Sequence, residues 1–198
     1  MNERTSNAIV DRRAFVSQLI EACPDSLIIS GLGSSSYDVF AAGDRPQNFY
    51  LWGAMGGAAA VGLGLALAQP SKSVIVITGD GEQLMGLGVF ATIAAQRPAN
   101  LNIVVLDNGH FGETGMQRSH SSLGADLAAV ARGCGIDNVV KVNTLDQIPA
   151  LADAINSRGT TLMAQVFVPA EELPRALPPR DGVYVKNRFR ASLGFAPM

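Results

Sequence analysis

Short runs of valine, isoleucine and leucine alternate along the chain with segments of helical periodicity. These runs predict strands because they are nearly continuous in apolar side chains, as in sheets that helices cover on both faces. The predicted strands are Ser26–Ser30, Ser73–Thr78, Leu101–Leu106, Asn138–Val142 and Leu162–Val168. Because strands alternate with helices across short connections, we expect an α/β fold with a three-layer, doubly wound and mostly parallel sheet.

The segments between these strands carry helix start and stop signals. One apolar face stops at Pro24, Asp126 can cap a second helix, and Thr144 with Gln147 forms a capping box before a third. The residues of these three patterns are Val16, Leu19, Ile20 and Cys23; Leu127–Arg132; and Leu145, Ile148, Leu151, Ala152 and Ile155. A further segment, Leu84–Ala95, is apolar nearly all round, and we expect it to form one buried helix.

The uncharged stretch Leu51–Gln69 approaches the length of about 20 apolar residues that a transmembrane helix needs. Glycines dilute its hydrophobicity and no Lys or Arg flanks its start, so we expect a buried helix with close backbone packing. The N-terminal segment Met1–Arg13 is polar and charged and lacks the apolar region of a signal peptide.

Length and composition limit the classes of function. The 198 residues, 47% of them hydrophobic, suit one domain over residues 1–198. Fifteen Lys and Arg against 17 Asp and Glu give a net charge of −2, which argues against a general nucleic-acid binder. Cys23 and Cys134 form no CxxC pair, which argues against a cysteine-held iron–sulfur or zinc site and favours a cytoplasmic location.

The C-terminal segment at about 175–198 contains proline and is basic. We expect an ordered surface extension, or an arm that packs on a neighbouring chain. The alternative is that its cations contact an anionic ligand. The basic residues of this segment are Arg175, Arg180, Lys186, Arg188 and Arg190.

Glycine and polar residues follow three of the predicted strands, where doubly wound sheets bind ligands. The segment Gly31–Ser36 could bind phosphate at a helix N-terminus, although such loops are common without a ligand. Asp80 lies between two glycines and suits a hard cation, and Asn108 follows the next strand 28 positions further on. Either turn alone fits ordinary turn chemistry. The pair at this spacing predicts one shared site at the edge of the sheet.

Gly79-Asp80-Gly81 followed by Asn108 resembles the signature of thiamine-diphosphate enzymes, and Gly53–Gly56 resembles the segment that holds the aminopyrimidine of the cofactor. The resemblance covers roughly residues 28 to 136 and lies within the diphosphate-binding (PP) domain of that family. A narrower likeness is to sulfopyruvate decarboxylase β subunits and the matching half of phosphonopyruvate decarboxylases. It is carried by Asn48–Tyr50, Leu84-Met85 and Thr114–Gln117.

The resemblance implies the thiamine-diphosphate-binding fold, with thiamine diphosphate and Mg²⁺ (or Ca²⁺) as cofactors. Asp80, Asn108 and the main-chain carbonyl of His110 would ligate the metal. Gly81 and Glu82 would donate main-chain N–H groups to the diphosphate, and Met55 would enforce the bent V conformation. The full set of implied cofactor-binding residues is Ser34, Ser35, Gly53, Met55, Gly79, Asp80, Gly81, Glu82, Asn108, His110, Phe111 and Gly112.

The resemblance further implies a 2-oxo acid decarboxylase subunit acting on an anionic substrate such as sulfopyruvate or phosphonopyruvate. The activating Glu of the family lies on a pyrimidine-binding (PYR) domain, so we expect an α subunit as partner, in an α2β2 or larger heteromer that the single chain needs for activity. The Gly/Ala-rich segment Gly53–Ala68 is a candidate contact surface. His110, His120 and Arg118 share one loop and are candidates for substrate-anion binding or proton transfer, unless the loop is simply exposed.

Several alternatives remain open. Glu82 stands where the decarboxylases more often have Ser, and Met116 replaces a glycine of the family pattern. These departures leave the substrate open. The chain could also be the PP half of a split transketolase, which is usually longer in this region, or of a 2-oxoacid oxidoreductase, which usually carries cluster cysteines, or a non-catalytic cofactor-binding subunit. A nucleotide-binding Rossmann domain is disfavoured because no clean GxGxxG follows a strand.

Overall fold

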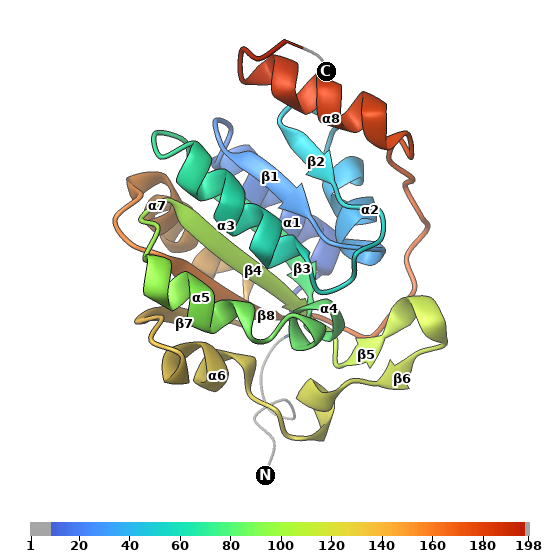
Figure 1. Cartoon of the computed structure of the whole chain (residues 1–198). Helices are drawn as coiled ribbons and strands as arrows, with labels where there is room; N and C mark the ends of the chain where they lie inside the picture. The colour runs from blue at the N-terminus through green and yellow to red at the C-terminus, as the bar shows by residue number, and fades with distance from the viewer. Residues whose placement is uncertain (1–8, 197–198) are drawn as a thin grey trace.

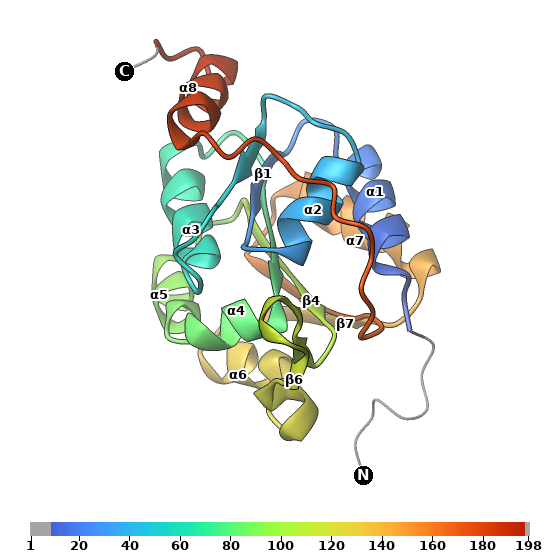
Figure 2. The same cartoon turned by 90° about the vertical axis from the view of Figure 1, so that its right-hand side faces the viewer.

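A six-stranded parallel sheet lies between two layers of helices in the computed structural model, which describes residues 9–196 (Figures 1 and 2). The strand order is β2-β1-β3-β4-β8-β7. The bounds are β1 Leu27–Ser30, β2 Asn48–Tyr50, β3 Val74–Gly79, β4 Leu101–Asp107, β7 Asn138–Val142 and β8 Leu162–Phe167. All neighbouring strands pair in parallel, so their carboxyl ends meet at one edge of the sheet.

Two hydrophobic clusters, one on each side of the sheet, attach the helices (Figure 2). One layer comprises α1 (Arg12–Ala22), α2 (Ser34–Ala41) and α7 (Ile148–Ser157), and the other comprises α3 (Ala58–Ala68), α5 (Val89–Gln96) and α6 (Leu127–Gly133). The short helix α4 (Asp80–Met85) starts at the carboxyl end of β3. The remaining elements are the hairpin of β5 (His110–Phe111) and β6 (Gln117–Arg118), the 3-10 turns Gly112–Thr114, His120–Leu123 and Leu145–Gln147, and α8 (Gly182–Ser192).

The five predicted strands and the predicted fold class are confirmed, with strand ends within one residue of the expected positions. The capping predictions also hold. The Asp126 carboxylate accepts a hydrogen bond from the Ala129 N–H at 3.0 Å, and the capping box of Thr144 and Gln147 is present before α7. Strands β2, β5 and β6 were not predicted because two or three residues are too short to show a period.

The expectation of one buried helix over Leu84–Ala95 is wrong. The segment contains the end of α4 and most of α5, with a break at 86–88. Gly86 lies in this break and packs closely on the turn before α3, since a Cβ added at Gly86 would lie 2.1 Å from the Gly56 carbonyl oxygen. The outer sides of these helices are exposed, and Met85 is 63% exposed.

The uncharged stretch Leu51–Gln69 contains α3, whose inner side packs closely on the sheet. A Cβ added at Gly62 would lie 2.2 Å from Val76 Cγ2, so this glycine allows the helix to approach β3. None of the helices in the described chain has the length and apolarity required to cross a bilayer. The expectation about a signal peptide concerns in part residues 1–8, which lie outside the described range.

The basic C-terminal segment crosses the molecule outside α2 and ends in α8, which lies beside β2 (Figures 1 and 2). Trp52 donates a hydrogen bond from Nε1 to the Pro179 carbonyl at 2.8 Å, and Phe189 packs edge-on against Phe49 with ring centroids 5.6 Å apart. Arg188 forms an ion pair with Asp44 at 2.6 Å. Up to residue 196 this segment is therefore an ordered extension that packs on its own chain.

Candidate functional site

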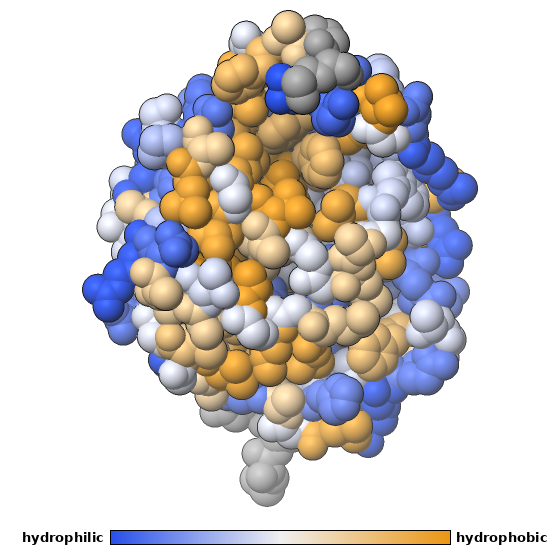
Figure 3. Space-filling view, viewed as in Figure 1, coloured by the Kyte–Doolittle hydropathy of each residue, from blue (hydrophilic) through white to orange (hydrophobic). Residues whose placement is uncertain are grey.

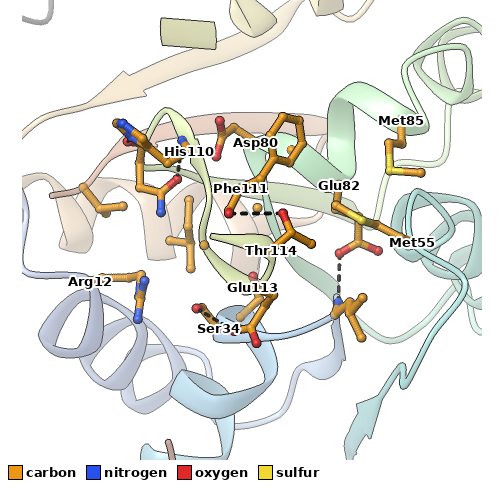
Figure 4. Close-up of a pocket in the computed structure, with 18 residues that line it drawn as sticks. Arg12, Ser34, Met55, Asp80, Glu82, Met85, His110, Phe111, Glu113 and Thr114 are labelled. Carbon is orange, nitrogen blue, oxygen red and sulfur yellow. Dashed lines mark hydrogen bonds between the residues drawn. The ribbon is translucent and has the colours of Figure 1, made fainter. Parts of the chain in front are cut away.

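A cavity of about 200 Å³ lies at the carboxyl edge of the sheet, where the loops after β1, β3 and β4 meet (Figure 4). Loop residues from distant parts of the sequence line it because the strand ends that carry them are neighbours in the sheet. It is lined by Arg12, Leu32, Ser34, Ser35, Met55, Gly79, Asp80, Gly81, Glu82, Met85, Leu106, Asn108, His110, Phe111, Gly112, Glu113, Thr114 and Val168.

The cavity brings together most of the residues predicted from the sequence. Of the implied cofactor-binding residues, Gly53 alone does not line it. The others come from the start of α2, the turn before α3, the β3–α4 junction and the segment after β4. The prediction that Asp80 and Asn108 share one sheet edge therefore agrees with the arrangement of the lining residues.

Asp80 is buried and held in place by the loop that follows β6. Its Oδ2 accepts hydrogen bonds from the hydroxyls of Ser119 and Ser121, the latter at 2.8 Å. Ser121 also donates to Asp107 Oδ1 at 2.9 Å. These serines were missed in the sequence because their role depends on the loop folding back beneath Asp80, which no local pattern reveals.

The metal-ligand candidates fit a hard cation better than a soft one. A carboxylate from Asp80, a carboxamide from Asn108 and a main-chain carbonyl at His110 are all oxygen ligands, as Mg²⁺ and Ca²⁺ prefer. Across residues 9–196, no group of three or more His, Cys, Asp and Glu side chains gathers as a transition-metal site would require. The donor set thus agrees with a cation that also takes ligands from a bound anion and water.

The end of the cavity formed by α2 and α1 carries charges of both signs, because the Glu113 carboxylate lies 3.5 Å from the Ser34 hydroxyl and a buried arginine lies nearby. Ser34 begins α2, and the residue before it is Gly33, with φ +73. Because glycine has no side chain, it gives no cap to the first N–H groups of this helix. Arg12 lines the same end and is only 5% exposed. It pairs with Asp38, which Arg13 also contacts at 3.2 Å, so two guanidinium groups share one carboxylate.

Burial raises the pKa of Asp38, and the two arginines counteract this effect. If Asp38 is ionised, the cluster of Arg12, Arg13 and Asp38 has a net charge of +1 next to the cavity. Arg12 was missed because it opens an ordinary amphipathic helix in the sequence. Its distance of 96 positions from Asn108 gives no sign that the two side chains line one cavity.

The opposite end of the cavity is apolar. Figure 4 shows Met55 and Met85 on the side away from Arg12. Met55 follows a tight turn in which Gly53 has φ +90 and Ala54 has φ +50, and it remains 38% exposed. Met85 is 63% exposed as well, so the apolar end of the cavity is partly open to solvent, and Gly53 lies outside the lining residues.

Arg118 and His120 do not line the cavity, so their role in substrate-anion binding or proton transfer stays a prediction. Arg118 folds back on its own loop, donating hydrogen bonds to the Ser122 carbonyl at 2.6 Å and its hydroxyl at 3.2 Å. His120 is exposed because the serines on either side of it turn inward to Asp80. Of the three residues singled out in this loop, His110 alone lines the cavity.

The residues present fit a molecule with an anionic tail and an apolar ring system. The anionic end would meet oxygen ligands for a divalent cation, a helix N-terminus and the buried Arg12. At Gly79 an added Cβ would meet nothing within 4 Å, so the wall there is open. The ring end would meet the thioether side chains of Met55 and Met85, which adapt to irregular apolar surfaces.

Comparison with known families agrees with this arrangement. Residues 32–164 match the family model described as "Thiamine pyrophosphate enzyme, C-terminal TPP binding domain". The chain is 42% identical over 188 residues to phosphonopyruvate decarboxylase of Streptomyces viridochromogenes, covering 94% of this chain and 47% of that protein. It is 35% identical over 169 residues to sulfopyruvate decarboxylase subunit beta of Methanocaldococcus jannaschii, covering 84% of this chain and 88% of that subunit.

The chain therefore spans about half the length of the phosphonopyruvate decarboxylases it matches, and most of the length of the beta subunits. Among solved structures, a putative thiamin diphosphate-dependent enzyme of Mycobacterium smegmatis superposes with a TM-score of 0.71 at 22% identity. That superposition covers 86% of this chain and 35% of the other. At this identity it supports the fold alone.

Proposed function

Since this chain belongs to the thiamine pyrophosphate enzyme family, as a C-terminal TPP-binding domain, we propose that it is the diphosphate-binding subunit of a two-subunit 2-oxo acid decarboxylase. Thiamine diphosphate is the cofactor of this domain family. The observation that carries the proposal is the cavity at the carboxyl edge, which combines a Gly-Asp-Gly turn, Asn108 and an anion-binding helix end beside an open apolar wall.

The proposed roles follow the two ends of the cavity. Asp80, Asn108 and the His110 carbonyl hold Mg²⁺ against the diphosphate. Ser34 and Ser35 at the start of α2 bind its outer oxygens. The supporting residues along the walls are Gly79, Gly81, Glu82, Phe111 and Gly112. Arg12 adds a cation that the sequence did not indicate.

At the other end, Met55 would support the bend of the cofactor, and the Gly53 carbonyl would accept a hydrogen bond from its aminopyrimidine. When bound, thiamine diphosphate would supply a nucleophilic carbon that adds to the 2-oxo acid and a cationic ring that takes up the electron pair left by CO₂. The chain's residues fix and orient the cofactor, and the buried loops around Asp80 limit access of water from the sheet side.

We propose that a PYR-domain polypeptide, as α subunit, covers the open end and supplies the activating Glu, in an α2β2 or larger heteromer. Three features support this assembly. Met55 is partly exposed, the outer side of α3 is exposed and apolar, and relatives named subunit beta are matched over 88% and 95% of their length. The chain would then contribute one PP-type domain with its basic C-terminal extension. Its two cysteines form no disulfide, which favours a cytoplasmic location.

The proposed substrate is an anionic 2-oxo acid such as sulfopyruvate or phosphonopyruvate. Support comes from relatives of 35% and 42% identity that carry these substrates in their names. Since Arg118 and His120 do not line the cavity, we assign the choice between the two substrates to residues that the partner contributes.

Production of the chain alone and together with an α-type polypeptide that carries a PYR domain tests this proposal. CO₂ release is measured with sulfopyruvate, phosphonopyruvate and pyruvate, in the presence of thiamine diphosphate and Mg²⁺. We expect turnover by the pair only, and a loss of at least about 100-fold in Asp80→Asn, which removes the charged metal ligand. Asp153→Asn on the exposed side of α7 is the matched control. Decarboxylation by the single chain would contradict the divided active site, and a pair without turnover would favour a non-catalytic subunit.

A further inference from the structure

The side chain of Glu82 turns inward from the start of α4 and is only 4% exposed. Its Oε2 accepts a hydrogen bond from the backbone N–H of Leu32 at 3.0 Å, drawn as a dashed line in Figure 4, and another from the Thr78 hydroxyl, also at 3.0 Å. Leu32 belongs to the loop after β1, and Thr78 lies in β3 just before the Gly-Asp-Gly turn. One carboxylate therefore joins two of the segments that form the cavity.

The other oxygen of this carboxylate, Oε1, is buried and makes no hydrogen bond of ordinary geometry within the described chain, and a third segment approaches the carboxylate as a whole. Burial raises the pKa of Glu82, while the Thr78 hydroxyl and the backbone N–H groups of Leu32, Ala58 and Gly56 act in the opposite direction. Ala58 and Gly56 lie at the start of α3, so the turn that carries Met55 also approaches the carboxylate.

Gly31 shows how tightly this carboxylate is packed. A Cβ added at Gly31 would lie 1.8 Å from Glu82 Oε2 and 3.0 Å from Thr78 Oγ1. The Gly31 N–H also donates to the Ile77 carbonyl at 2.8 Å, which fixes its backbone against β3. Its φ does not require glycine. Any side chain at position 31 would therefore overlap the Glu82 carboxylate, and glycine leaves the space that this carboxylate occupies.

We propose that Glu82 is a positioning residue whose side chain joins the loop after β1 to the end of β3, beside the turn before α3, and that Gly31 is its structural counterpart. The loop after β1 carries Ser34 at the anionic end, and the turn before α3 carries Met55 at the ring end. A shared carboxylate preforms both ends before the cofactor arrives, which lowers the cost of ordering the loops on binding. This inference rests on the proposed function for its role, but the tie itself is a property of the chain alone.

Amide hydrogen exchange of the full chain without cofactor tests the tie directly. We expect the Leu32 amide to exchange at least about tenfold faster in Glu82→Ala, because its acceptor is lost. In Glu82→Gln the side-chain carbonyl can still accept, so exchange should remain within about threefold of the wild type. Thr161→Val is the control, since it removes a buried 2.7 Å hydrogen bond to the Pro98 carbonyl at the opposite edge of the sheet. Equal Leu32 exchange in the wild type and Glu82→Ala would overturn the proposal.

Calorimetric titration with thiamine diphosphate and Mg²⁺ tests the consequence for binding. We expect Glu82→Ala to weaken binding about tenfold, Glu82→Gln to retain it, and Gly31→Ala to weaken it at least as much. In Gly31→Ala, the further change Glu82→Ala should cause no additional loss, because the clash partner is removed. Additive losses in the double variant would overturn the pairing of the two residues. A wild type that binds no thiamine diphosphate would overturn the proposed function, while the exchange result would still decide the tie.

Discussion

The two helical layers have similar inner sides and very different outer sides. Toward the sheet, α1 and α5 each bury a phenylalanine completely, Phe15 and Phe90. Toward the outside, α1 and α7 expose polar or charged residues such as Gln18, Glu21 and Asp153. The sequences of α3 and α5 contain no charged residue at all.

The outer side of α3 and α5 is accordingly apolar or small, and Figure 3 shows orange surface over this region. Its exposed residues are Ala60, Val61, Gly64, Leu67, Ala68, Ala91, Thr92 and Ala95, with the uncharged polar Gln96 at the end of α5. We call this set the open face, and the outer side of α1 and α7 the closed face. Charge is depleted in the cores of protein interfaces and abundant on solvated helices. The inner sides of both layers therefore contribute to folding, whereas the uncharged open face is suited to association with another chain.

The largest expected effect comes from placing a charge in the open face. Val61 is 38% exposed in the middle of α3, and Val61→Arg would leave a guanidinium without a partner in a buried interface. We expect the affinity for the α-type polypeptide to fall at least about 100-fold, or roughly 2.7 kcal/mol. Gln18→Arg on the closed face should have no effect. Size-exclusion chromatography with light scattering measures both, and normal assembly of Val61→Arg would show that the partner binds elsewhere.

A smaller effect separates the two sides of α3 itself. Gly62 faces the sheet, and a Cβ added there would lie 2.2 Å from Val76 Cγ2. A Cβ added at Gly64 would meet nothing within 4 Å. We expect Gly62→Ala to destabilise the isolated chain by about 1–3 kcal/mol through overpacking. Gly64→Ala should stabilise it by about 0.5–1 kcal/mol, because alanine is the better helix former. Urea unfolding measures both variants, and changes of the same sign would contradict the assignment of the two sides.

The smallest effect tests whether the layers are equally well anchored. Asp11 caps α1 by accepting from the Ala14 N–H at 2.7 Å, and Asp126 caps α6 by accepting from Ala129 at 3.0 Å. Replacing either with Ala should cost about 1 kcal/mol in unfolding free energy. A much smaller cost in α6 would mean that the layer with the open face is loosely held.

The pH dependence of the Asp126 contribution has a definite sign. Burial alone would raise the pKa of Asp126, but the Ala129 N–H and the Lys141 ammonium lower it below its usual value. Its stabilising effect is therefore fully present above its unfolded pKa of about 3.9 and is lost as the pH falls through the lower folded value. The difference in unfolding free energy between the wild type and Asp126→Ala should shrink below about pH 4.

The sequence was most informative where one element could be recognised from its own residues. The buried strands, the Asp126 cap and the Gly-Asp-Gly turn are local patterns, and each agrees with the structure. Leu84–Ala95 was also recognised correctly as apolar, but that pattern cannot distinguish burial within the chain from burial against another chain. Gly86 in the break packs on Gly56, which is 30 positions away in sequence.

The candidate site was predictable in its residue types and only partly in its geometry. Asp80 and Asn108 could be paired because parallel strands place successive turns at one edge. Arg118 and His120 shared a loop with His110, yet loop membership does not determine which side chains face inward. Arg12 was missed because its position depends on how α1 packs against α2, which involves the buried Asp38.

The helix α8 has a consequence for how this protein can associate. Edge strands invite pairing with strands of other molecules because their outer backbone groups lack partners. At the β2 edge, Arg188 donates to the Asn48 carbonyl at 3.1 Å. At the β7 edge, Arg132 donates to the Val139 carbonyl at 2.8 Å. Arginine side chains thus occupy carbonyl groups at both margins of the sheet, which discourages edge-to-edge aggregation and leaves helical faces as the route to a specific complex.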